Sequence, residues 1–169
     1  RWQNGGGITH QLCRQDDEQG LLWRLSIAEV ASDGPFSRFD NIDRIIMLLT
    51  GGGFSLHGVG AKPEVLNTAL TPFAFAGETA IHCTLLNGAV RDFNLMTRRN
   101  TVQAELQVLT VSSAVQSLPL STQTFIYIAS ARLNWHLMTG TFAQGLLLVK
   151  EIEQHLAQDA QHIDQHRLM

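Results

Sequence analysis

The sequence predicts a mainly β fold, a sandwich or barrel of antiparallel strands that ends in a C-terminal helix. Glycines recur through the first half of the chain, among them Gly20, Gly34, Gly58 and Gly77, and short apolar or alternating segments separate them. Such spacing is typical of antiparallel β proteins. From residue 150 onward the chain has no glycine or proline, and its apolar residues recur at helical spacing. Its 169 residues are enough for one domain with a buried core.

Strands and tight turns account for the first half of the chain. The segment ITHQL predicts a strand, and residues 22–30 place Trp23, Leu25 and Ile27 on one face, as a half-buried strand does. The segment SDGPFS predicts a turn, because glycine and proline favour the backbone angles of turns. The segment DRIIMLLTGGGFSLHG then predicts a strand, a glycine turn and a second strand.

Residues 88–100, GAVRDFNLMTRRN, predict a strand with an unusual amount of charge. Strand side chains alternate between faces, so Asp92, Asn94 and Arg98 share one face while Arg99 lies on the other. A surface strand normally has one apolar face, and a buried parallel strand has two. Because neither face is cleanly apolar here, we expect one of them to line a polar cavity.

The rest of the chain predicts four further strands and a helix. The strands are residues 79–86, 103–112, 124–132 and 146–150. The helix follows from Ile152, Leu156 and Ile163, whose spacing puts them on one stripe. We therefore divide the chain into a β domain of residues 1–150 and a helical tail of residues 151–169 that packs on it.

The same tail has histidines at metal-binding spacing. His155, His162 and His166 fall on a neighbouring stripe of the predicted helix together with Asp159. Side chains three or four residues apart on a helix can share a Zn²⁺ ion. A solvated polar flank is the commoner explanation for such a stripe, and we favour it.

Composition argues against several functional classes. The formal net charge is -3 and the pI is near 6.1, unlike the basic surfaces that bind nucleic acid. Cys13 and Cys83 are the only cysteines, and they predict free thiols in a reducing compartment. The longest aliphatic run, residues 45–49, is too short to span a bilayer, and no basic-then-apolar leader opens the chain. We therefore expect a cytoplasmic protein without nucleic-acid or membrane partners.

Arginines are the most informative candidates for a binding site. The chain has no G-x-S-x-G elbow, Walker loop, C-x-x-C pair or H-E-x-x-H helix. Arg24, Arg44 and Arg99 lie within or beside apolar strands, where a guanidinium needs an anionic or carbonyl partner. Internal acids such as Asp43 and Asp92 offer structural ion pairs for any single arginine. Three arginines together favour a ligand carboxylate, which the planar guanidinium binds in a bidentate geometry.

Three stretches in fixed order resemble the HutD/Ves family. They are WQNGGGITHQL, WRLSIAEVASDGPFSRFDNIDRIIMLLTGGGFSL and GAVRDFNLMTRR, and beyond residue 100 the resemblance is weak. Members of that family are similar to bicupins, which join two cupin-like β-barrel halves in one chain. The resemblance therefore implies a bicupin-like double β-barrel or sandwich of antiparallel strands.

The resemblance also implies a function. It links the chain with histidine utilisation in bacteria, and some family members with stress response. It implies the binding of a small carboxylate, such as N-formylglutamate or urocanate, and this agrees with the arginines. The matching polar motif positions are Asn4, Thr9, Arg24, Ser26, Ser37, Arg44, Asp92, Asn94 and Arg99. We expect the charged and amide side chains of residues 92–99 to orient one another around the ligand.

The motif differs from that of metal-dependent cupins. Those proteins carry His-x-His with a Glu on one strand, whereas the corresponding segment here, SDGPFSRFDNIDR, has no histidine. His10, His57, His82 and His136 are too scattered to replace that motif by spacing alone. We therefore expect neither a metal nor another cofactor.

The favoured function is a metal-free binding protein for a small carboxylate, acting as a sensor or regulator. An enzyme that acts on the same acids is the first alternative, with Asp92 or a histidine as general base. In that enzyme Arg44 or Arg99 would stabilise negative charge. The second alternative is a partner-binding module that docks through residues 152–163. Whether the chain forms a homodimer is left open.

Overall fold

The computed structural model describes residues 6–110, 124–129 and 146–150. Two antiparallel sheets make up most of this part. The five-stranded sheet has the order β1-β2-β9-β4-β7, with β1 at Gly7–Asp17, β2 at Gly20–Val30, β4 at Ile42–Thr50, β7 at Pro72–Ala76 and β9 at Val90–Arg98. The four-stranded sheet has the order β3-β8-β5-β6, with β3 at Gly34–Pro35, β5 at Phe54–His57, β6 at Glu64–Leu66 and β8 at His82–Leu85.

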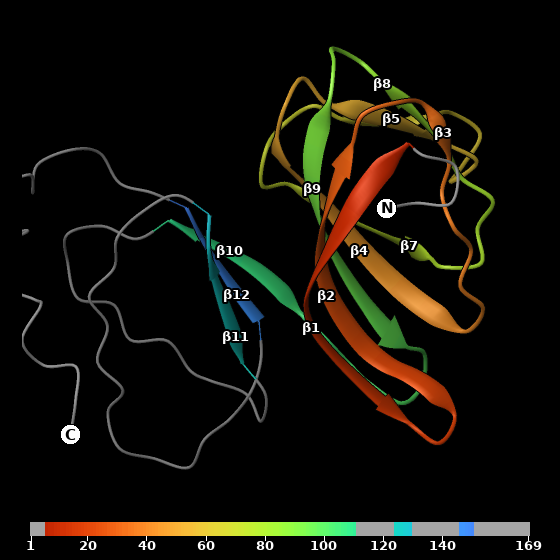
Figure 1. Cartoon of the computed structure of the whole chain (residues 1–169), viewed down its shortest axis with the longest axis vertical. Coiled ribbons are helices and arrows are strands. Elements are labelled where there is room, and N and C mark those ends of the chain that lie inside the picture. Colours follow the sequence, from red (N-terminus) through yellow and green to blue (C-terminus); the bar gives the residue numbers. More distant parts are fainter. Residues whose placement is uncertain (1–5, 111–123, 130–145, 151–169) are drawn as a thin grey trace, which may run out of the picture.

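A buried apolar cluster joins these two sheets. Alternate residues of β2, β4 and β9, among them Val30, Ile46 and Val90, pack against Phe54 and Leu56 of β5. In Figure 1, β3, β5 and β8 lie at the top of the molecule, above the long strands of the five-stranded sheet. The face of the five-stranded sheet that meets this cluster is called the inner face below.

A third sheet covers part of the opposite, outer face of the five-stranded sheet. It contains β10 (Leu106–Thr110), β12 (Leu146–Lys150) and β11 (Phe125–Ile128) in that order, and Figure 1 shows it to the side of the two larger sheets. The outer-face residues Trp23 and Phe93 meet Phe125 and Tyr127, with ring centroids 5.0 and 6.0 Å apart respectively. The part of the outer face that this third sheet covers is therefore apolar.

The predicted mainly β, antiparallel fold is confirmed, with two differences of detail. The strands β10, β11 and β12 lie where strands were expected, but they pair in parallel. Parallel pairing depends on crossover connections, which the local alternation of residues does not reveal. The short strands β6 and β7 were not predicted, and the two-residue strand β3 lies in the segment expected to form a turn.

Some predictions fall outside the described residues. These are the helical tail of residues 151–169, its histidine stripe and the site residue Asn4. In the part of the chain that the structure describes, no helix has the length and hydropathy needed to cross a membrane.

Candidate functional site: a polar pocket on the inner face

Strand pairing brings polar residues from three neighbouring strands into adjacent rows. The register places Arg24 of β2 and Arg44 of β4 on either side of Met96 of β9. In the next row, Ser26 of β2 lies opposite Asn94 of β9. All of these positions are even-numbered and therefore face the same side of the sheet, where alternation also puts Asp92.

These rows line a pocket of about 60 Å³ on the inner face. The predicted site residues in its lining are Thr9, Arg24, Ser26, Ser37, Arg44, Asp92 and Asn94. By the same measure, a space of about 10 to 15 Å³ is enough for one water molecule. The pocket therefore has room for a small acid or for the carboxylate end of a larger one.

Arg44 is the most deeply buried cation of the pocket, with a relative exposure of 6%. Its Nε donates to Oδ1 of Asn94 and its Nη1 donates to the carbonyl oxygen of Ser37, both at 3.3 Å. Neither acceptor is charged. Among the described residues, no carboxylate lies within ion-pair distance of this guanidinium.

Aromatic rings surround the Arg44 guanidinium. Its Cζ lies 5.6 Å from the ring centroids of both Phe36 and Phe39 and 4.9 Å from that of Phe75. Ring faces attract a cation but replace only part of the water that it loses. Burial accordingly lowers the pKa of Arg44 to about 10, with Asp92 opposing this effect and Arg24 adding to it.

Arg24 supplies a second guanidinium to the same pocket. Its Nη2 lies 2.8 Å from Sδ of Met96, a weak acceptor, and its Cζ lies 5.3 Å from the Phe39 ring centroid. Its Nε is buried and has no hydrogen-bond partner. Burial lowers the pKa of Arg24, and the positive charge of Arg14 lowers it further. Two cations therefore approach one pocket with part of their hydrogen-bonding capacity unused.

Asp92 lines the pocket and is almost completely buried. Its relative exposure is 1%, and both carboxylate oxygens lack a hydrogen-bond partner. Burial raises the pKa of this carboxyl to about 7, while the charge of Arg44 and the nearby Asn94 side chain act in the opposite direction. Asp92 therefore changes its protonation near neutral pH.

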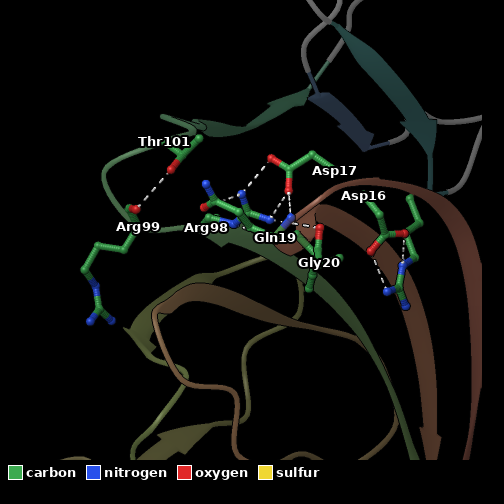
Figure 2. A network of polar contacts seen from close by, with 9 residues as sticks. Asp16, Asp17, Gln19, Gly20, Arg98, Arg99 and Thr101 are labelled. Atoms are coloured by element: carbon green, nitrogen blue, oxygen red, sulfur yellow. Dashed lines mark hydrogen bonds and ion pairs between the residues drawn. The ribbon is translucent and has the colours of Figure 1, made fainter.

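Arg98 and Arg99 do not line this pocket. The Arg98 guanidinium binds both carboxylate oxygens of Asp17 at 2.7 Å, as Figure 2 shows. The Arg99 guanidinium points away from Arg98 and pairs with Asp43 at 2.8 Å and with Glu78 at 2.6 Å. The expectation that residues 92–99 orient one another thus differs from the structure, because the last two arginines find acids from distant segments.

The sequence interpretation missed the aromatic wall of the pocket. Phe36 belongs to the segment predicted as a turn and Phe39 follows it, and both line the pocket with Ser37, which was the only residue of the three named as a site residue. Two phenylalanines three residues apart, with Arg38 between them, were the available sign of an aromatic wall. It did not show that the segment folds back over Arg24 and Arg44.

The described residues include no group of three or more His, Cys, Asp or Glu side chains placed to hold a metal ion. The pocket contributes a single carboxylate, Asp92, and no histidine or cysteine. Its side chains match an organic anion better than a transition metal, since two guanidiniums face it.

Comparison with known proteins agrees with the resemblance noted from the three sequence stretches. The model of the HutD family matches residues 1–166. The chain belongs to the HutD family. This HutD family member is 43% identical over 108 residues to an uncharacterised 21.2 kDa protein in the hutC 3' region of Pseudomonas putida, a match that covers 63% of this chain and 56% of the relative. It is 41% identical over 108 residues to protein Ves of Cronobacter sakazakii, covering 63% of this chain and 59% of that protein.

A solved structure of the same family is also similar. The structure of HutD from Pseudomonas fluorescens SBW25, titled with a formate condition, has 40% sequence identity and a TM-score of 0.54. The match covers 57% of this chain and 53% of the solved one. This HutD family member therefore matches little more than half the length of such relatives.

Proposed function

We propose that this chain is a metal-free, cupin-type binding protein that takes a small carboxylate into the inner pocket. Arg24 and Arg44 carry the proposal, because both guanidiniums reach the pocket and neither has an ion-pair partner among the described residues. A sensor or regulator needs only such a site together with a response to its occupation.

The energetics of burial favour an anionic ligand. Removing a guanidinium from water is costly unless a charge or strong hydrogen bonds replace the water. The neutral contacts of Arg44 at 3.3 Å replace only part of it. A ligand carboxylate would supply charge-assisted hydrogen bonds, each worth about 1.5 to 3 kcal/mol.

Family membership narrows the choice of acid. One relative is described by its position in the hutC 3' region, and another is called HutD. We propose an intermediate of histidine utilisation, such as N-formylglutamate or urocanate, with a regulatory or stress-related role. Both are small carboxylates, and the pocket of about 60 Å³ would hold their acidic end.

An enzyme acting on the same acids is the second candidate. Asp92 favours it, because burial raises the pKa of this carboxyl to about 7, where a general base works best near neutral pH. No serine, cysteine or histidine among the described residues forms a catalytic pair in the pocket.

A thermal-shift screen separates these candidates. Purified chain is mixed with formate, N-formylglutamate, urocanate and other small acids at several concentrations, and each acid that raises the Tm is followed by NMR for turnover. We expect concentration-dependent stabilisation without turnover. Product formation would establish the enzyme instead, and the absence of stabilisation by any acid would reject the proposed function.

A further inference from the structure

The unused hydrogen-bonding groups of the pocket are of two kinds. Arg24 Nε is a buried donor without an acceptor, and the two Asp92 oxygens are buried acceptors without a donor. Buried polar groups without partners are rare in folded proteins and each needs an explanation. A ligand that ends in a carboxylate satisfies the arginine and leaves Asp92 unsatisfied.

No described neighbour makes a hydrogen bond to the Asp92 oxygens, although the Asn94 side chain is near enough to lower the pKa of this carboxyl. Asn94 holds the Arg44 Nε, and no ion pair joins Arg44 to Asp92 among the described residues. Residues i and i+2 of a strand, which face the same side of the sheet, are about 6.8 Å apart along the strand. The Arg44 guanidinium reaches the row of Asn94, and Asp92 lies in the row beyond, so the two charges interact through space without an ion pair between them.

We propose that Asp92 determines ligand specificity by accepting a hydrogen bond from an O–H or N–H group of the bound acid. This inference rests on the proposed function and adds the chemical class of the ligand. The pocket takes acids that carry a hydroxyl, amine, amide or ring N–H donor in addition to the carboxylate. Arg24 and Arg44 hold the carboxylate, and Asp92 holds the donor.

Discrimination against simple acids has a direct physical cause. An acid with a methyl group in place of the donor leaves the Asp92 carboxylate buried and unpaired beside a second carboxylate. A site that contains a buried polar group strongly rejects a ligand that leaves this group without a hydrogen-bond partner. An apolar site rejects a ligand with extra atoms much less strongly.

The test compares acids of matched shape. Glycolate and propionate differ only by a hydroxyl in place of a methyl group, and malate and methylsuccinate form a longer pair of the same kind. Dissociation constants are measured at pH 8 by NMR titration of the full chain. We expect the hydroxy acid of at least one pair to bind about tenfold more tightly than its methyl partner.

The variant Asp92→Leu removes the acceptor and keeps the branched shape of the side chain, with a larger apolar group, and replacing a buried charge by an apolar group is often tolerated by the fold. We expect the preference for the hydroxy acid to disappear and propionate to bind within about threefold of its wild-type affinity. If Asp92→Leu does not fold, Asp92→Asn keeps the shape and is expected to reduce the preference, since a neutral acceptor makes a weaker bond.

Each outcome is decisive. Equal binding of both members of each pair to the wild type would overturn the inference and leave the proposed function standing. A preference that persists in folded Asp92→Leu would overturn it as well, because another group would then bind the donor. If none of the four acids binds although an acid of the thermal-shift screen does, the inference fails and the proposed function stands; if no acid of either set binds, both fail.

Discussion

Asp92 and Arg44 show how burial changes the chemistry of single residues. Each side chain is nearly inaccessible to water. Burial raises the pKa of Asp92 and lowers the pKa of Arg44, and both shifts favour the neutral form of the side chain. The two charges partly stabilise each other without direct contact. Such groups are costly to the fold, and a binding site is the usual reason for keeping them.

The Asp92 carboxyl makes stability depend on pH in a defined direction. Its pKa is raised from 3.8 to about 7 in the folded chain, so between about pH 4 and pH 7 the folded state holds a proton that the unfolded state has lost. Stability from this group is therefore fully present below about pH 4, falls as pH rises to about 7, and is level above that. The steepest slope is about 1.4 kcal/mol per pH unit, the value for one proton.

Chemical denaturation of the wild type and of Asp92→Asn from pH 5 to pH 8 measures this effect. We expect the wild type to lose stability relative to Asp92→Asn as the pH rises. The control Asp40→Asn, at an exposed position, keeps Asp92 and should follow the wild type. Parallel curves for wild type and Asp92→Asn would show that Asp92 keeps an ordinary titration in the folded protein.

At the scale of elements, β9 carries two separate functions. Asp92 and Asn94 of this strand line the pocket. Arg98 at its end holds the β1–β2 hairpin through Asp17 and the carbonyl oxygens of Gly20 and Leu21. One strand thus contributes both to the candidate site and to the attachment of a neighbouring hairpin.

Replacing Arg98 by alanine should destabilise the fold without affecting the pocket. We expect the Tm to fall by several degrees, because the side chain is buried and joins strands distant in sequence. Arg14→Ala is the matched control. It removes an exposed pair with Asp16 on the same hairpin, which contributes little to stability. Equal Tm changes in the two variants would contradict the assignment.

Two glycines with similar backbone angles test how closely the β4–β5 turn packs. Gly51 and Gly20 have φ of 106° and 99°, but a Cβ on Gly51 would lie 2.6 Å from the Ala89 carbonyl oxygen, whereas one on Gly20 meets nothing within 4 Å. Alanine is strained at both positions, at about 1 to 3 kcal/mol. We expect Gly51→Ala to cost clearly more in urea denaturation than Gly20→Ala. A smaller or equal cost would show that the turn relaxes easily.

At the scale of the whole molecule, local patterns predicted the fold better than the site. Alternation in residues 22–30 and 88–100 identified the strands and the faces of β2 and β9 correctly. It did not identify partners, because Arg98 and Asp17 are 81 residues apart and their meeting depends on the sheet order. The same limit applies to the parallel sheet and to Phe36 and Phe39, since pairing and loop return are properties of the complete fold.

The central claim is tested most directly by measuring how tightly one acid binds to the wild type, to Arg44→Lys and to Arg91→Lys. The Tm of each protein is measured as well. The acid is the one with the highest affinity in the screen described above, and Arg91 is an exposed arginine of β9 that serves as control. Lysine keeps the charge but loses the bidentate geometry. We predict that Arg44→Lys stays folded and binds about ten- to a hundredfold more weakly, while Arg91→Lys binds like the wild type. Unchanged affinity in folded Arg44→Lys would remove Arg44 from the site and contradict the account.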